Sequence, residues 1–100
     1  MGYNDWTRMK CCQARLYQSP AGISGDVNYP DGNFGTGCYG VDSQTVVDSL
    51  CRIMEKYPRQ EVTVRVELKR WNLRKCDKPL DEETLAEIRQ LLCDQDYKVR

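Results

Sequence analysis

Reactive side chains are few in this sequence, and histidine is absent. Without an imidazole, neither a Ser-His-Asp triad nor a Cys-His pair can form, and zinc sites that use histidine are excluded. The six cysteines are Cys11, Cys12, Cys38, Cys51, Cys76 and Cys93. No two of them are spaced as C-x-x-C, the usual spacing of zinc ligands. We therefore expect no metal site, no cofactor and no enzymatic activity.

Cys76 is the cysteine whose neighbours favour reactivity. It follows Arg74 and Lys75 and lies two residues before Lys78. Because positive charges stabilise a thiolate, a reactive Cys76 is one hypothesis, and an incidental loop thiol is the other. Several other cysteines occupy apolar-periodic positions, where a thiol acts as a small hydrophobic group. With no apolar signal segment at the start, we expect reduced thiols and a cytoplasmic protein.

Three glycines, Gly35, Gly37 and Gly40, match the pattern G-x-G-x-x-G. This pattern binds dinucleotide phosphates when a strand runs into it and a helix begins inside it. Here the expected helix begins after Gly40, and the chain is too short for a dinucleotide-binding fold. We interpret the glycines as a bend between a hairpin and a helix, where close approach or a positive φ excludes a side chain. A weak anion site at nearby backbone N–H groups is the alternative.

A basic strand and the loop after it form the candidate binding surface. The stretch 61–71, EVTVRVELKRW, alternates apolar and polar residues, so one face is expected in the core and the other in solvent. Cations next to an aromatic residue suit phosphates and bases, but Trp and Arg also anchor protein interfaces. The expected surface consists of Arg65, Lys69, Arg70, Trp71, Arg74, Lys75 and Lys78. That Trp71 merely folds over its own sheet remains an open alternative.

The elements that must position these residues make up one α+β domain over residues 1–100. Apolar residues at spacings of three and four predict a helix from Asp42 or Ser43 to just before Pro58, and a second helix after the N-cap Asp81. Strands are expected over 8–18, 61–71 and 97–100, with a hairpin whose arms are 27–29 and 33–34. The expected order is β-β-β-α-β-α-β, with both helices on one face of a mainly antiparallel or mixed sheet.

The charge pattern bears on the type of partner. Fifteen Lys and Arg balance fifteen Asp and Glu, but residues 21–51 contain no basic residue, whereas residues 52–79 are predominantly basic. A nucleic-acid binder usually has an overall basic footprint, so the acidic flanks favour a protein partner. We expect a small non-enzymatic binding protein of the inhibitor or adaptor type, acting by contact with a larger protein. The alternative is a nucleic-acid or nucleotide binder that uses residues 65–78 or the glycines of 35–40.

Two further expectations concern association. No apolar run approaches the roughly 20 residues that a membrane-spanning helix needs, so no membrane partner is expected. An exposed sheet edge leaves homodimerisation open, because an unpaired strand can pair with a second copy.

Overall fold

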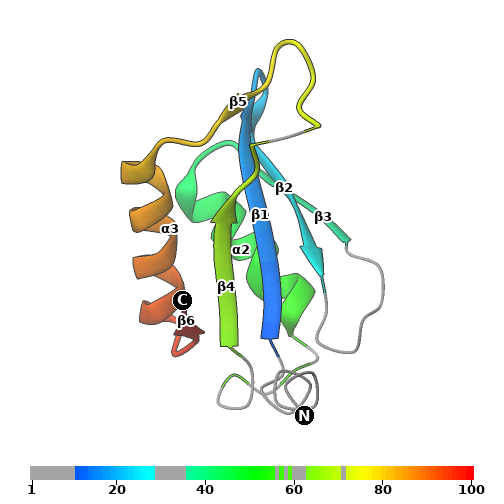
Figure 1. Cartoon of the computed structure of the whole chain (residues 1–100). Coiled ribbons are helices and arrows are strands. Elements are labelled where there is room, and N and C mark those ends of the chain that lie inside the picture. The colour runs from blue at the N-terminus through cyan, green and yellow to red at the C-terminus, as the bar shows by residue number, and fades with distance from the viewer. Residues whose placement is uncertain (1–10, 29–35, 56, 58, 60–62, 71) are drawn as a thin grey trace.

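The computed structural model describes residues 11–28, 36–55, 57, 59, 63–70 and 72–100. The elements are β1 (Cys11–Ser19), β2 (Gly22–Asn28), β3 (Thr36–Gly40), α2 (Ser43–Met54), β4 (Thr63–Leu68), β5 (Lys78–Pro79), α3 (Glu82–Asp94) and β6 (Lys98–Val99) (Figure 1). The expected α+β class and the order β-β-β-α-β-α-β are confirmed. The two-residue β5 is an addition between β4 and α3.

The described strands form one mixed sheet in the order β3-β2-β1-β4-β6, and β5 pairs with β1 beside this path. β1, β2 and β3 pair antiparallel, whereas β4 pairs in parallel with β1 and β6 in parallel with β4. Parallel neighbours need a crossover connection, and α2 and α3 supply the two crossovers. Consequently β1, β3 and β4 run in the same direction, and their C-terminal ends lie at the same end of the sheet. The 69–79 loop extends from this end (Figure 1).

Both helices pack on the same face of the sheet. In Figure 1, α2 lies behind the strands, and the uncovered face of the sheet points toward the viewer. The helices and strands share one core, whose fully buried members include Cys12, Leu16, Val46, Val47, Leu50, Met54, Val64, Val66, Ile88 and Leu92. Burial of a large aliphatic side chain contributes about 1.5–3 kcal/mol, so this layer contact holds the domain together.

Each helix begins at an aspartate, as the sequence predicts for Asp42 and Asp81. Asp42 accepts hydrogen bonds from the Thr45 hydroxyl at 2.6 Å and the Thr45 backbone N–H at 2.9 Å. Asp81 accepts from the Thr84 backbone N–H at 2.8 Å. Hydrogen bonds from the threonine side chain, followed by those from its backbone N–H, lower the pKa of both carboxyl groups. The two carboxylates therefore satisfy N–H groups that the helix itself leaves unpaired.

The region from residue 20 to residue 40 contains more strand than the sequence predicts. The arm predicted at 27–29 overlaps the end of the longer β2, and β3 follows at Thr36–Gly40, whereas the predicted turn and the predicted arm 33–34 lie outside the described residues. Glycine disfavours strands, which is why GISGD and TGCYG do not read as strands in isolation. At Gly25 the glycine is required by packing, since a Cβ there would overlap the carbonyl oxygen of Arg15 on β1.

Candidate functional site

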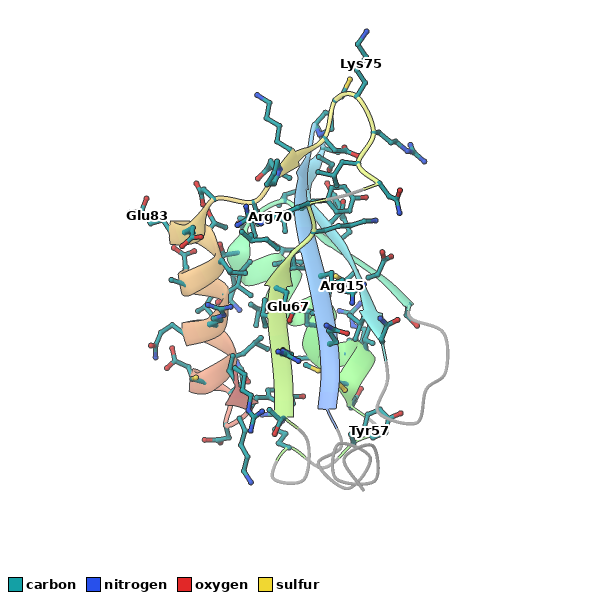
Figure 2. All side chains as sticks on the ribbon, viewed as in Figure 1. Arg15, Tyr57, Glu67, Arg70, Lys75 and Glu83 are labelled. Carbon is teal, nitrogen blue, oxygen red and sulfur yellow. The ribbon has the colours of Figure 1, made fainter. Side chains whose placement is uncertain are left out.

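The uncovered face of the sheet is polar and positions the candidate site. Side chains alternate along β1, so the residues between buried Cys12, Ala14 and Leu16 point away from the helices. The strand register places Arg15 between Glu67 of β4 and Asp26 of β2. Figure 2 shows Arg15 and Glu67 on this face, in front of the sheet.

Glu67 is the acceptor at the centre of this face. Its carboxylate lies 3.0 Å from Arg65 Nε and 3.9 Å from Arg15 Nε, and it accepts a hydrogen bond from Gln13 Nε2 at 2.9 Å. The Arg65 side chain is 56% exposed, so its ion pair remains in contact with solvent. Arg65, the first residue of the expected binding surface, is thus partly neutralised by its own strand.

Lys69 joins the strand face to the loop. Its backbone N–H donates to the Leu16 carbonyl oxygen at 2.8 Å, which fixes it beside the end of β1. Its Nζ lies 3.5 Å from Asp26 Oδ2 and 5.3 Å from the centre of the Tyr17 ring. The ring face attracts a cation at this distance, so Lys69 is held over an aromatic surface.

The loop carries the remaining expected cations away from the sheet. Arg70, Arg74, Lys75 and Lys78 are exposed, and none has a carboxylate within 4.0 Å among the residues the structure describes. The loop is closed by Asp77, which accepts from the Arg74 N–H at 3.0 Å and donates its own N–H to the Arg74 carbonyl at 2.9 Å. Lys75 lies at the tip and points away from the sheet, whereas Arg70 lies at the loop's start (Figure 2). Trp71 lies outside the described residues.

Cys76 is exposed and lines a pocket at the end of β1. The pocket has a volume of about 240 Å³ and is lined by Gln18, Ser19, Pro20, Cys76 and Lys78. Both Gln18 Nε2 and Ser19 Oγ donate to the Gly22 carbonyl oxygen, at 3.1 and 2.8 Å. Their donors are therefore already used, and the thiol and the Lys78 amine are the reactive groups that remain at this pocket.

Of the other described cysteines, Cys12 and Cys38 are buried in the core, Cys51 is half-buried at its margin, and Cys93 is exposed. Cys12, Cys38, Cys51, Cys76 and Cys93 are all free thiols. Burial, and then the negative charge of Asp26, raise the pKa of Cys38 to about 12. Burial likewise raises the pKa of Cys51, which lies beside Tyr97. These two thiols are uncharged at neutral pH and unsuited to nucleophilic attack.

The glycine pattern is used for packing where it can be followed. Gly37 lies within β3 and Gly40 at its end, and Gly35 is outside the described residues. A Cβ at Gly40 would overlap the backbone of Thr45 and Val46 in the first turn of α2, so the predicted close approach is confirmed there. A Cβ at Gly37 would meet nothing nearer than 3.9 Å. Since Asp42 already accepts the Thr45 N–H, that donor is not available to an external anion.

Other kinds of site have no geometric support in the described part of the chain. Within it, no group of three or more Cys, Asp or Glu side chains gathers that could hold a metal ion. No helix described there is both long and apolar enough to cross a membrane. The chain matches no protein-family model, no curated protein and no solved structure.

The charges separate between the two sides of the molecule. We define the basic sheet side as the uncovered face plus the 69–79 loop. Its nine described basic residues are Arg15, Arg65, Lys69, Arg70, Arg74, Lys75, Lys78, Lys98 and Arg100. Lys98 pairs with Thr63 on the uncovered face, and Arg100 follows in the same alternation. Three carboxylates, Asp26, Glu67 and Asp77, share this side.

The acidic helix side has the reverse composition. It comprises α2, α3 and the segments at their ends. The acidic residues described there are nine: Asp42, Asp48, Glu55, Asp81, Glu82, Glu83, Glu87, Asp94 and Asp96. Its three described cations are Arg52, Arg59 and Arg89. Arg59 donates to the Gln95 carbonyl and lies over the Tyr97 ring, and Arg89 donates to the Val66 carbonyl. Two of these three cations are thus engaged in tertiary contacts.

Sequence reasoning identified the strand 61–71 and its loop but not their neighbours. It did not assign Arg15, Tyr17, Tyr39, Lys98 or Arg100 to the same surface. The alternation in β1 already indicates that Arg15 and Tyr17 face solvent. Their position beside Glu67 and Lys69 depends on the parallel pairing of β1 with β4, which has no local sequence signal.

Proposed function

We propose that this protein is a small binding protein of the inhibitor or adaptor type, which acts by contact and not by catalysis. Its basic sheet side would dock on an anionic surface of a larger partner. The observation that carries the proposal is the separation of charge among the described residues, with nine cations and three carboxylates on a side that neither α2 nor α3 covers. Such a surface both steers an anionic partner and leaves the core undisturbed when the partner binds.

The acidic segments on either side of the basic segment do not have the significance in the folded chain that they have in the sequence. The sequence favours a protein because acidic segments flank the basic one. In the folded chain, however, most of these acidic residues lie on the helix side, so they do not interrupt the basic surface. An acidic protein surface remains the partner that the sequence predicts, and a nucleic acid is no longer disfavoured by the flanks. The free thiols agree with a reducing compartment such as the cytoplasm.

An affinity pull-down with mass spectrometry, run with and without nuclease, tests this proposal. Three baits are needed: the unmodified chain, Arg74→Glu with Lys75→Glu on the basic sheet side, and Glu87→Lys with Asp94→Lys on the acidic helix side. The second and third baits reverse the same number of exposed charges in opposite directions. We expect a partner that the first and third baits capture and the second does not. Equal capture by all three baits would contradict the proposal.

A further inference from the structure

Two tyrosines lie in one row across the uncovered face, near the C-terminal ends of β1 and β3. Tyr17 of β1 pairs with Ser24 of β2, and Ser24 pairs with Tyr39 of β3. Neighbouring strands are about 4.8 Å apart, so the two tyrosine backbones are separated by about 10 Å. The residue between them, Ser24, is small and leaves the surface between the rings low.

Tyr39 offers an accessible ring held in a defined position. It is 45% exposed, and its hydroxyl donates to the Ala21 carbonyl oxygen at 2.5 Å. Its backbone N–H donates to Ser49 Oγ of α2 at 3.4 Å, which ties this edge of the sheet to the helix. A ring that is already ordered loses little entropy when a planar ligand stacks on it.

Basic side chains lie beside the Tyr17–Ser24–Tyr39 row, on and after β4. Lys69 lies over the Tyr17 ring, and Arg70 follows it at the start of the loop. Lys75 extends the positive charge beyond the end of the sheet (Figure 2). Arg74 precedes it in the same loop, and Arg65 adds a cation on β4. Aromatic rings with cations beside them are the arrangement that holds bases and phosphates of an unpaired strand.

We propose that the basic sheet side binds single-stranded nucleic acid, with a base stacked on Tyr39 and phosphates held by Lys69 above the Tyr17 ring, by Arg70 and by the loop cations. This inference rests on the proposed function and names the partner. Paired bases present no free ring face in the middle of a duplex, so an exposed stacking ring such as Tyr39 selects unpaired strands.

The low apolar content of the described part of the surface favours a nucleic acid over a protein. Stable protein interfaces have an apolar centre, rich in aromatic side chains and Met. Of the residues that the structure describes, Tyr39 and Val41 are the exposed large hydrophobic ones. Protein–nucleic acid interfaces are more polar and much more positive, which matches this side of the molecule.

The carboxylates on this side do not prevent phosphate binding. Asp26 lies 3.5 Å from Lys69 and is well exposed, and Glu67 pairs with an exposed Arg65. Each pair has one well-exposed member, Asp26 at 60% and Arg65 at 56%, although the Lys69 side chain is only 20% exposed. Ion pairs open to solvent contribute about 0–1 kcal/mol, so a phosphate can compete with the carboxylate at either cation.

The test measures fluorescence anisotropy of end-labelled oligonucleotides of about 12 nucleotides, titrated with the full chain. Single-stranded RNA, single-stranded DNA and a duplex form separate arms. We expect single strands to bind more tightly than the duplex, with the logarithm of the association constant falling by about 0.7 per phosphate contact for each tenfold rise in salt. The RNA and DNA arms then show which sugar the surface prefers.

Matched variants locate the site. Tyr39→Leu should weaken single-strand binding about tenfold, whereas Tyr39→Phe, which keeps the ring, should stay within about twofold. Arg70→Gln should reduce the salt dependence by about one phosphate contact. Arg52→Gln, an exposed arginine on the acidic helix side, should change neither quantity. Circular dichroism of each variant confirms that it is folded.

Three results would overturn the inference: no binding at low salt, equal affinity for duplex and single strand, or unchanged affinity in folded Tyr39→Leu. If oligonucleotides fail to bind while the pull-down yields a nuclease-resistant protein that Arg74→Glu with Lys75→Glu loses, this inference is wrong and the proposed function stands. If that pair of substitutions changes neither experiment, both are wrong.

Discussion

The two sides of this molecule use their side chains differently. On the acidic helix side, the helices bury their apolar stripes in the core, and their N-terminal aspartates bond the first turns. On the basic sheet side, long polar side chains form exposed ion pairs and a projecting loop. The helix side therefore maintains the fold, whereas the sheet side contributes little to stability and is free to contact a partner.

Gly40 lies where the two sides meet, and its replacement should have the largest effect on stability. Gly40→Ala would force β3 and the first turn of α2 apart, because the new Cβ would overlap backbone atoms that cannot rotate away. Overpacking of this kind typically costs about 1–3 kcal/mol, and more where backbone must move. Urea denaturation measures the free energy of unfolding.

Gly37→Ala is the matched control for that experiment. Its Cβ would have no neighbour nearer than 3.9 Å, so the free energy of unfolding should change by less than about 0.5 kcal/mol. Equal losses from both substitutions would show that the tight strand–helix contact is not what Gly40 provides.

The next largest expected difference is in the rate at which the cysteines react with an alkylating reagent. Cys76 on the sheet-side loop is exposed, whereas Cys38 is buried and its pKa is raised to about 12. Because the thiolate is the reacting form, Cys38 should resist alkylation at pH 8 until the protein unfolds. Mass spectrometry after timed alkylation gives the order. Early labelling of Cys38 would contradict the described core, and a rate at Cys76 equal to that of a free cysteine would remove the reactive-thiol hypothesis.

Acidification should lower the free energy of unfolding, because it protonates the N-cap carboxylates of α2 and α3. The pKa values of Asp42 and Asp81 are lowered in the folded chain by hydrogen bonds from Thr45 and Thr84. An ordinary aspartate has a pKa of about 3.9, so the unfolded chain takes up these protons first. The stabilisation is present above about pH 4 and is lost as the pH falls through the lower folded pKa values.

Thermal unfolding at neutral and acidic pH measures this loss. Asp42→Ala with Asp81→Ala should lower stability at neutral pH and should lose less on acidification than the unmodified chain. An identical loss in both proteins would assign the acid sensitivity to other carboxyl groups.

The smallest effect on stability is expected from Glu67→Gln at the centre of the sheet side. The amide keeps the shape and removes one negative charge from between Arg15 and Arg65. Exposed ion pairs contribute at most about 1 kcal/mol, so the unfolding free energy should barely change. Affinity for a polyanion should rise several-fold, since the cations lose a competing carboxylate. A folded variant with unchanged affinity would show that this part of the face takes no part in binding.

The sequence predicts the helix side well because its signals are local. Apolar spacing and the N-caps Asp42 and Asp81 define both helices within a few residues. The alternation in 61–71 likewise identifies β4 and its solvent face. These features depend only on residues within a few positions of each other.

The candidate site is harder to predict because it depends on distant residues. Tyr17 and Tyr39 come from strands separated by β2, whose glycines hide its strand character, and Lys69 reaches Tyr17 only through the parallel β1–β4 pairing. Apart from Asp26, the described acidic residues of the segments that flank the basic one lie on the other side of the fold. Sequence proximity therefore misrepresents the charge of the surface.

The most direct test of the division between the sides is the affinity of the two charge-reversed proteins for the same single-stranded oligonucleotide. Arg74→Glu with Lys75→Glu should bind at least about tenfold more weakly than the unmodified chain at moderate salt, and Glu87→Lys with Asp94→Lys should bind as well or better. Equal weakening by both pairs, or none by the first pair, would contradict the assignment of binding to the basic sheet side.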